Sequence, residues 1–191
     1  MKKALALFLA LSLVLSAFAG CGGKPPEEEE EDILLTAALI NGREYPLDTT
    51  RLSLRKVELT DEDMEQISRL TELTSLDLRQ TFVTDLEPLA LLENLEHLDL
   101  AFNGITDISP LRELVNLRTL DLRHNDIRGV GALVNLLELT ELELGSNLIS
   151  DVRPLVVLTK LTELHLYGNL IEDYTQYDEL KRALPGCKLN Y

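Results

Sequence analysis

The chain has 191 residues, of which 18 are basic and 33 acidic, so its formal net charge is −15 at pH 7. Phosphate binding requires the opposite sign of charge, and this balance therefore excludes a nucleic-acid partner. Hydrophobic residues make up 45 % of the chain and only two cysteines are present. A disulfide framework is therefore not expected, and the fold has to be held by its core.

Residues 1–20 have the organisation of an export signal. Two lysines precede an uncharged apolar run from Ala4 to Ala19, as in secretory signal peptides. The run ends at Phe18-Ala19-Gly20-Cys21, which resembles a bacterial lipobox, although leucine is usual where Phe18 stands. The resemblance implies that Cys21 is acylated, becomes the mature N-terminus and anchors an exported protein to the outer side of a bacterial cell membrane.

Two other outcomes stay open for this segment. Ala17-Phe18-Ala19 is also a small-x-small site, at which an ordinary signal peptidase would release a soluble protein. Alternatively, an apolar run of about 20 residues remains uncleaved as a membrane anchor. The three outcomes differ in whether Cys21 carries a lipid, and in whether the chain stays on the membrane.

Residues 21–32 are predicted to form a tether. This segment holds glycines, two prolines and the acidic run from Glu27 to Glu31, a composition that cannot bury a core. Residues 33–50 are predicted to form an N-terminal β cap, because Asn41-Gly42 between apolar residues is a hairpin signal.

Leucines recur every 22 residues through the middle of the chain. One row consists of Leu76, Leu98, Leu120, Leu142 and Leu164. A fixed period of this length predicts a stacked-repeat solenoid. Each repeat contains a Leu-x-Leu pair, the period-two pattern of a strand with one buried face. We therefore expect six coils over residues 51–173, with parallel strands on one side and a turn or short 3₁₀ helix on the return path.

Two coils depart from the regular repeat. The first is 24 residues long, and its return path from Asp61 to Ile67 begins with acidic residues, which predicts a true helical turn. Most other coils have a run such as Asp107 to Pro110, in which aspartate caps the turn and proline suits its start. Gly129-Val130-Gly131-Ala132 replaces this run in the fourth coil. Residues 174–191 predict a C-terminal cap of a helix and an edge strand, with Cys187 as a small buried residue.

An asparagine follows the strand in four coils and is predicted to bond the backbone of neighbouring turns. These positions are Asn103, Asn125, Asn147 and Asn169, with Thr81 instead in the second coil. With them, the repeat resembles the bacterial leucine-rich repeat family, specifically the internalin-type class with 22-residue repeats, from Leu52 to Ile171. The resemblance implies an α/β solenoid: a right-handed coil with a curved parallel sheet on the concave face, and turns, 3₁₀ or short helices on the convex face.

Strand alternation places a set of polar and aromatic residues on the concave face. The candidate ligand-binding residues are Arg79, His97, Asp99, Phe102, Asp121, Arg123, His124, Glu143, His165 and Tyr167. The acidic column that runs from Asp77 to Glu143 has two interpretations. Either Arg79 and Arg123 neutralise it, or it forms a groove for a basic or polar protein segment, with Phe102 and Tyr167 as apolar anchors.

Catalysis and cofactors are not predicted. The three histidines lie in different coils, no nucleophile stands beside them, and no phosphate loop is present. Carboxylates in a column suit calcium, but no loop has ligand spacing, so we assign no metal site.

The sequence therefore predicts a surface-anchored protein-binding module, monomeric, with an unidentified protein partner on its concave face. The alternative is a structural envelope protein or self-associating scaffold without a ligand groove. Host adhesion belongs to some internalins only, so the resemblance does not by itself assign it.

Overall fold

The structure is a computed structural model that describes residues 36–191. The predictions made for the signal peptide, for acylation of Cys21 and for the acidic tether fall outside these residues. The unit from Ala38 to Tyr191 is the α/β solenoid expected from the 22-residue period. Within residues 36–191, no helix is both long enough and apolar enough to cross a membrane.

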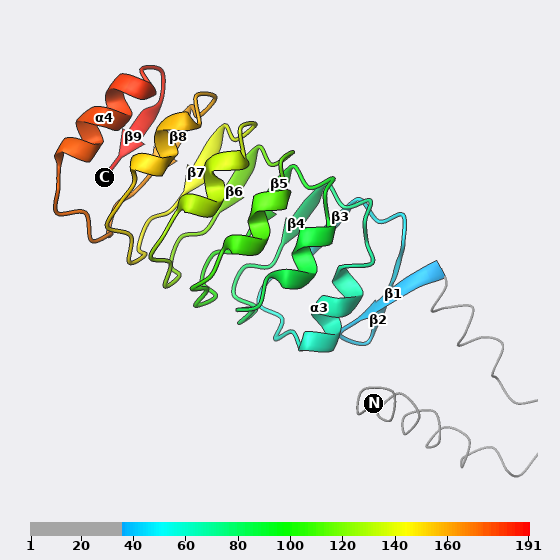
Figure 1. The fold of residues 1–191 in the computed structure, drawn as a ribbon. Helices are drawn as coiled ribbons and strands as arrows, with labels where there is room; N and C mark the ends of the chain where they lie inside the picture. Colours follow the sequence, from blue (N-terminus) through cyan, green and yellow to red (C-terminus); the bar gives the residue numbers. More distant parts are fainter. Residues whose placement is uncertain (1–35) are drawn as a thin grey trace, which may run out of the picture. The chain divides into compact units, whose positions relative to one another are not determined.

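One parallel sheet runs the length of this unit (Figure 1). Its strands are β3 (Arg51–Ser53), β4 (Ser75–Asp77), β5 (His97–Asp99), β6 (Thr119–Asp121), β7 (Glu141–Glu143), β8 (Glu163–His165) and β9 (Lys188–Asn190). The strands follow one another in chain order, and the register sets leucine against leucine, as in Leu98 opposite Leu120. The expected strand alternation is therefore confirmed, because each central leucine is buried while its neighbours face outward.

Short helices cover the other side of the coils (Figure 1). They are α3 (Asp61–Ile67), the 3₁₀ helices η1 (Glu87–Leu91), η2 (Ser109–Glu113), η3 (Gly131–Asn135) and η4 (Arg153–Val157), and α4 (Thr175–Ala183). The helical turn expected in the long first coil is confirmed as α3, which a reciprocal pair of contacts between Thr60 and Asp63 caps at its start.

The buried asparagines tie each coil to the next. Asn125 Oδ1 accepts from the backbone N–H groups of Asn103 at 3.2 Å and Ile105 at 2.9 Å. Its Nδ2 donates to the carbonyls of Leu100 at 3.0 Å and Leu122 at 2.9 Å. These groups lie in a buried turn, where an unpaired backbone group is costly. The predicted structural role of the asparagine column is thus confirmed.

The N-terminal end of the solenoid carries a two-stranded sheet of β1 (Ala37–Ile40) and β2 (Arg43–Pro46). Asn41 and Gly42 join these strands with φ values of 47° and 71°, which is the left-handed geometry of a tight hairpin turn. The Asn41 N–H also donates to Asp63 Oδ1 at 2.6 Å. This hydrogen bond links the hairpin to the first turn of α3.

The C-terminal end combines α4 with strand β9, which pairs with β8 as a seventh strand. The helix begins at Thr175, two residues before the apolar helical pattern that starts at Tyr177. Asp173 accounts for the difference, because its Oδ1 accepts from the N–H of Thr175 at 3.1 Å and from its hydroxyl at 2.6 Å.

Candidate functional site

The exposed face of strands β4 to β7 carries a groove of about 310 Å³. Its floor is acidic. The charged residues that line it are Asp77, Asp99, Asp121, Glu141, Glu143 and Arg123. Sequence reasoning expected an acidic column here, and the strand register places Asp77, Asp99, Asp121 and Glu143 directly opposite one another across the sheet.

Each aspartate of the column also has a structural role that sequence reasoning missed. Oδ1 accepts the backbone N–H two residues further on, with distances of 3.1 Å for Asp77, 3.0 Å for Asp99 and 3.1 Å for Asp121. Aspartate side chains often bond their own backbone in this way where a strand gives way to a turn. Oδ1 of each aspartate therefore already accepts one backbone N–H, and Oδ2 is the oxygen without a backbone partner.

Two arginines hold the second oxygens of the outer aspartates. Arg55 Nη2 lies 3.0 Å from Asp77 Oδ2, and Arg123 Nη2 lies 2.8 Å from Asp121 Oδ2. Of the two arginines expected to neutralise the column, Arg123 does so through an ion pair. Arg79 acts only from a greater distance, where its charge lowers the pKa of Asp99 and of Asp121. Among residues 36–191, no carboxylate oxygen lies within 4.0 Å of the Arg79 side chain, because its guanidinium lies over the Phe102 ring, 4.8 Å from the centroid.

Burial changes the acidity of the groove. Desolvation is the largest influence on Asp99 and raises its pKa above the ordinary carboxyl value, with added repulsion from Asp121 and Asp77. The pKa of Asp121 is also raised, again mainly by desolvation. Burial by itself lowers the pKa of Arg123, but the charges of Asp121 and Glu143, together with Tyr167, raise this pKa overall.

The aromatic residues of the face do not act as a pair. Phe102 stacks on the exposed ring of His124, with centroids 4.1 Å apart and planes 16° apart, so Arg79, Phe102 and His124 form one stack across three coils. Tyr167 instead lies over Gly145, where an added Cβ would come within 2.3 Å of the ring. Glycine at position 145 is therefore required for this placement of Tyr167.

The histidines of the face occupy separate positions. His97 Nδ1 lies 2.8 Å from the Thr119 hydroxyl, and His165 lies 3.7 Å from Glu143 and 3.5 Å from Glu163. Within the described part of the chain, no serine or cysteine side chain bonds to these histidines, and no cluster of His, Cys, Asp and Glu is suited to hold a metal ion. The arrangement offers hydrogen-bond acceptors and negative charge for binding.

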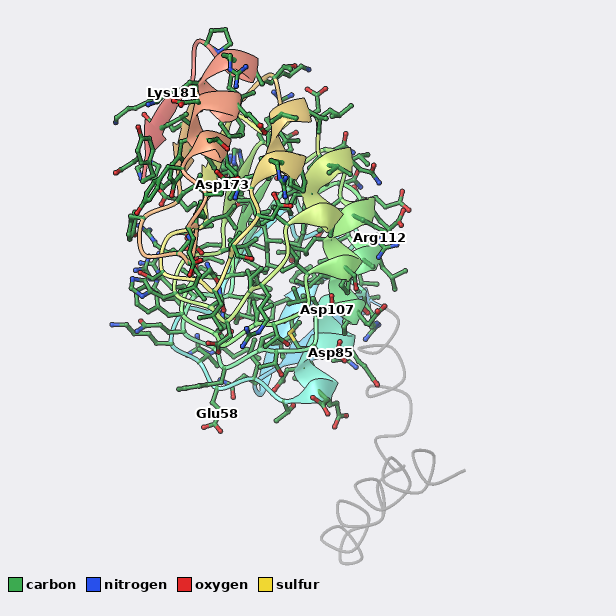
Figure 2. All side chains as sticks on the ribbon, turned by 60° about the vertical axis from the view of Figure 1, so that its left-hand side comes forward. Glu58, Asp85, Asp107, Arg112, Asp173 and Lys181 are labelled. Atoms are coloured by element: carbon green, nitrogen blue, oxygen red, sulfur yellow. The ribbon has the colours of Figure 1, made fainter. Side chains whose placement is uncertain are left out.

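A second hollow, of about 460 Å³, lies on the convex side between η2 and η3. Asp107 and Arg112 line one wall, and Gly129 and Gly131 line the other. Figure 2 shows Asp107 and Arg112 on this side of the molecule, with Asp85 of the preceding coil next to Asp107. An added Cβ at either glycine meets no atom within 4 Å, so this wall is open. In the fourth coil Gly129 stands where the third coil has Asp107, and Gly131 where it has Ser109.

Comparisons with known proteins agree with this architecture. The family model "Leucine Rich repeats (2 copies)" matches residues 93–136 and 137–181. Internalin C2 of Listeria monocytogenes is 40% identical with a TM-score of 0.60, and the match covers 66% of this chain and 55% of that chain. A second Listeria internalin, inlF, is 34% identical with a TM-score of 0.61 and coverage of 73% and 41%.

A leucine-rich repeat protein of Leptospira interrogans shares the fold at 22% identity, with a TM-score of 0.52 and coverage of 66% and 39%. No curated protein matches this chain in sequence. The chain thus spans little more than half of internalin C2 and less than half of inlF. Its fold is that of a leucine-rich repeat protein, and its similarity to the Listeria internalins supports a bacterial protein with internalin-type repeats.

Proposed function

We propose that this chain is a surface-anchored module that binds another protein on its concave face. Leucine-rich repeat domains are commonly interaction modules, which supports protein binding in general. One observation favours this face: strands β4 to β7 present an open groove whose carboxylates exceed its guanidinium groups. Desolvated charges of this kind favour specific recognition of a partner.

Membrane attachment through Cys21 is part of the same proposal. It is supported by the lipobox-like end of the apolar run, Phe18-Ala19-Gly20-Cys21, and by internalin similarity, which suggests export. We expect Cys21→Ser to leave the protein soluble or unprocessed and to abolish incorporation of a labelled fatty acid. An unaltered membrane fraction would argue for an uncleaved anchor, and normal processing after Ala19 for an ordinary signal peptidase.

Site-specific photo-crosslinking tests the binding face without changing its charge. We would place the crosslinking amino acid at His97, an exposed groove residue, and in a control at Glu113 on the convex helix η2. The proposal expects crosslinks to one protein of the cell envelope or of its surroundings from position 97 and none from position 113. Crosslinks from position 113 alone would reject the concave face.

A self-associating scaffold is the second candidate, and one observation favours it. Several large apolar side chains of the return paths are 45–63 % exposed, namely Leu91, Val115, Leu137 and Val157. Exposed apolar surface of this kind often marks an interface. Sedimentation of the full chain distinguishes the candidates, since a scaffold would assemble with rising concentration, whereas the binding module stays monomeric.

A further inference from the structure

Two carboxylate oxygens of the groove lack the partners that their neighbours have. The nearest cation to Asp99 Oδ2 is Arg55 Nη2 at 3.9 Å, which is beyond hydrogen-bonding distance. Glu143 Oε2 is buried and has no hydrogen-bond partner within the described residues, and Glu143 Oε1 is 3.7 Å from His165. By contrast, Asp77 and Asp121 each have an arginine at 3.0 Å or closer.

Because the groove is negatively charged, a cation is the partner that suits these two oxygens. Five carboxylates and one guanidinium line it, and His97, which also lines it, bonds to Thr119. Of the two oxygens, Glu143 Oε2 is the buried one, and a buried acceptor without a donor is costly, most of all when it is charged. The Asp99 side chain is 23 % exposed. Two positively charged donors from outside, one at each carboxylate, would pair with them and would reduce the repulsion along the column.

The strand register sets the distance between the two vacancies. Asp99 lies on β5 and Glu143 on β7, with Asp121 of β6 between them. Two steps between parallel strands span about 10 Å. Residues seven apart on one face of an α-helix are also separated by about 10 Å. A helix that lies along the solenoid axis can therefore present two basic side chains at the required spacing.

Resting on the proposed function, we propose that the partner docks a basic helical segment in this groove, with one lysine or arginine at Asp99 and a second at Glu143. Arg123 offers a donor rather than an acceptor. Its Nε is buried without a hydrogen-bond partner among residues 36–191, and an acceptor on the same segment would satisfy it.

Fluorescence anisotropy with the full chain in detergent tests the charge and the spacing. The probe is an alanine-based helical peptide with lysines at two positions seven apart, compared with an analogue that has glutamates there. We expect the lysine peptide to bind, with an affinity that falls as salt increases, and the glutamate peptide not to bind. Equal binding of the two peptides would overturn the proposal.

A charge-matched pair of variants locates the site. Asp99→Asn with Glu143→Gln removes both vacant carboxylates, while the asparagine can still accept the Ala101 N–H. We expect it to weaken lysine-peptide binding by at least about tenfold, which corresponds to about 1.4 kcal/mol. The control, Glu93→Gln with Glu113→Gln, changes the net charge equally at exposed positions outside the groove and should leave the affinity unchanged.

The remaining outcomes also decide the question. Calcium is also titrated alone. If the wild-type chain binds calcium but not the lysine peptide, and the Asp99→Asn and Glu143→Gln variant no longer binds calcium, the groove holds a metal ion instead of a basic segment. If crosslinks from position 97 identify a partner whose capture the same variant does not weaken, the basic segment is rejected and protein binding on this face stands. If the wild-type chain gives neither crosslinks from position 97 nor binding of the lysine peptide, both proposals are rejected.

Discussion

The third and fourth coils differ in local sequence on the convex side, yet their backbones agree. Asp107 precedes η2 and Pro110 lies in its first turn, whereas Gly129 and Ala132 stand at the same places before and in η3. Both helices have five residues, and the residues before them have φ and ψ of −110° and 12° in one and −109° and 10° in the other. Packing against neighbouring coils, rather than the local cap, therefore sets this turn.

The same two coils differ on the concave side in how their aspartates are paired. Asp121 has Arg123 at 2.8 Å, whereas Asp99 has Arg55 only at 3.9 Å, although both carboxylates accept the same kind of backbone N–H. The backbone hydrogen bond of each aspartate is therefore the same in both coils, whereas the distance to the nearest arginine differs. Variation of this kind on a constant frame is what gives a repeat protein its binding specificity.

The largest expected effect on stability comes from the buried leucine that each of the two convex turns has at the same position. Leu111 and Leu133 are both fully buried, so replacing either with alanine should lower the free energy of unfolding by about 3 kcal/mol. If packing sets the turns, the two losses should be similar in urea denaturation followed by circular dichroism. A much smaller loss for Leu133→Ala would show that the fourth coil is loosely packed.

The asparagines should give the next largest effect. Asn103→Ala and Asn125→Ala each leave buried backbone N–H and carbonyl groups without partners, so we expect each to lower the free energy of unfolding by about 2 kcal/mol. Asn116→Ala is the control, because its side chain is exposed and donates to one carbonyl only. A loss for Asn116→Ala as large as that for Asn125→Ala would contradict the role assigned to the buried column.

Substitutions of Gly129, at the turn before η3, should change the free energy of unfolding by a smaller amount. Gly129→Ala should raise the free energy of unfolding by roughly 0.5 kcal/mol by restricting the unfolded chain, because an added Cβ meets no atom there. Gly129→Asp should raise it further if the new carboxylate accepts the Gly131 N–H, as Asp107 Oδ1 accepts that of Ser109 at 2.8 Å. Equal thermal midpoints for the two variants would show that this cap adds nothing.

The smallest expected effect is the contribution of Asp99, on the concave side, to the pH dependence of stability. Its pKa is raised by desolvation first and by Asp121 and Asp77 second, so the folded state holds this proton more tightly than the unfolded chain. The resulting stability is fully present below the ordinary pKa of 3.8 and is lost as pH rises through the folded-state pKa.

Asp99→Asn removes this dependence on pH. In urea midpoints, the variant should be more stable than the wild type at neutral pH, and the difference should shrink as pH falls toward about 4. A difference that grew on acidification would show that the Asp99 carboxylate is stabilised in the folded state. Glu93→Gln is the matched control at an exposed position, and it should leave the pH dependence unchanged.

The fold was predictable in most particulars because its signals repeat. Leucine pairs at positions such as Leu98 and Leu100 predicted strands, and Asn41-Gly42 predicted the hairpin that links β1 and β2. Residues 174–191 predicted the helix of the C-terminal cap, but not the contact of Asp173 with Thr175 at its start, because such a contact leaves no periodic signal. An Asp-x-Thr pair at the edge of a helix pattern would have been the sign to look for.

By itself, the sequence determined which residues share the concave face, because strand alternation and a 22-residue period fix the direction of each side chain. Only the tertiary structure decided the contacts that these side chains make. Arg55 rather than Arg79 bonds to Asp77, Phe102 stacks on His124, and Tyr167 lies over Gly145. Long side chains choose among several rotamers, and each choice depends on the space and charge that the next coil provides.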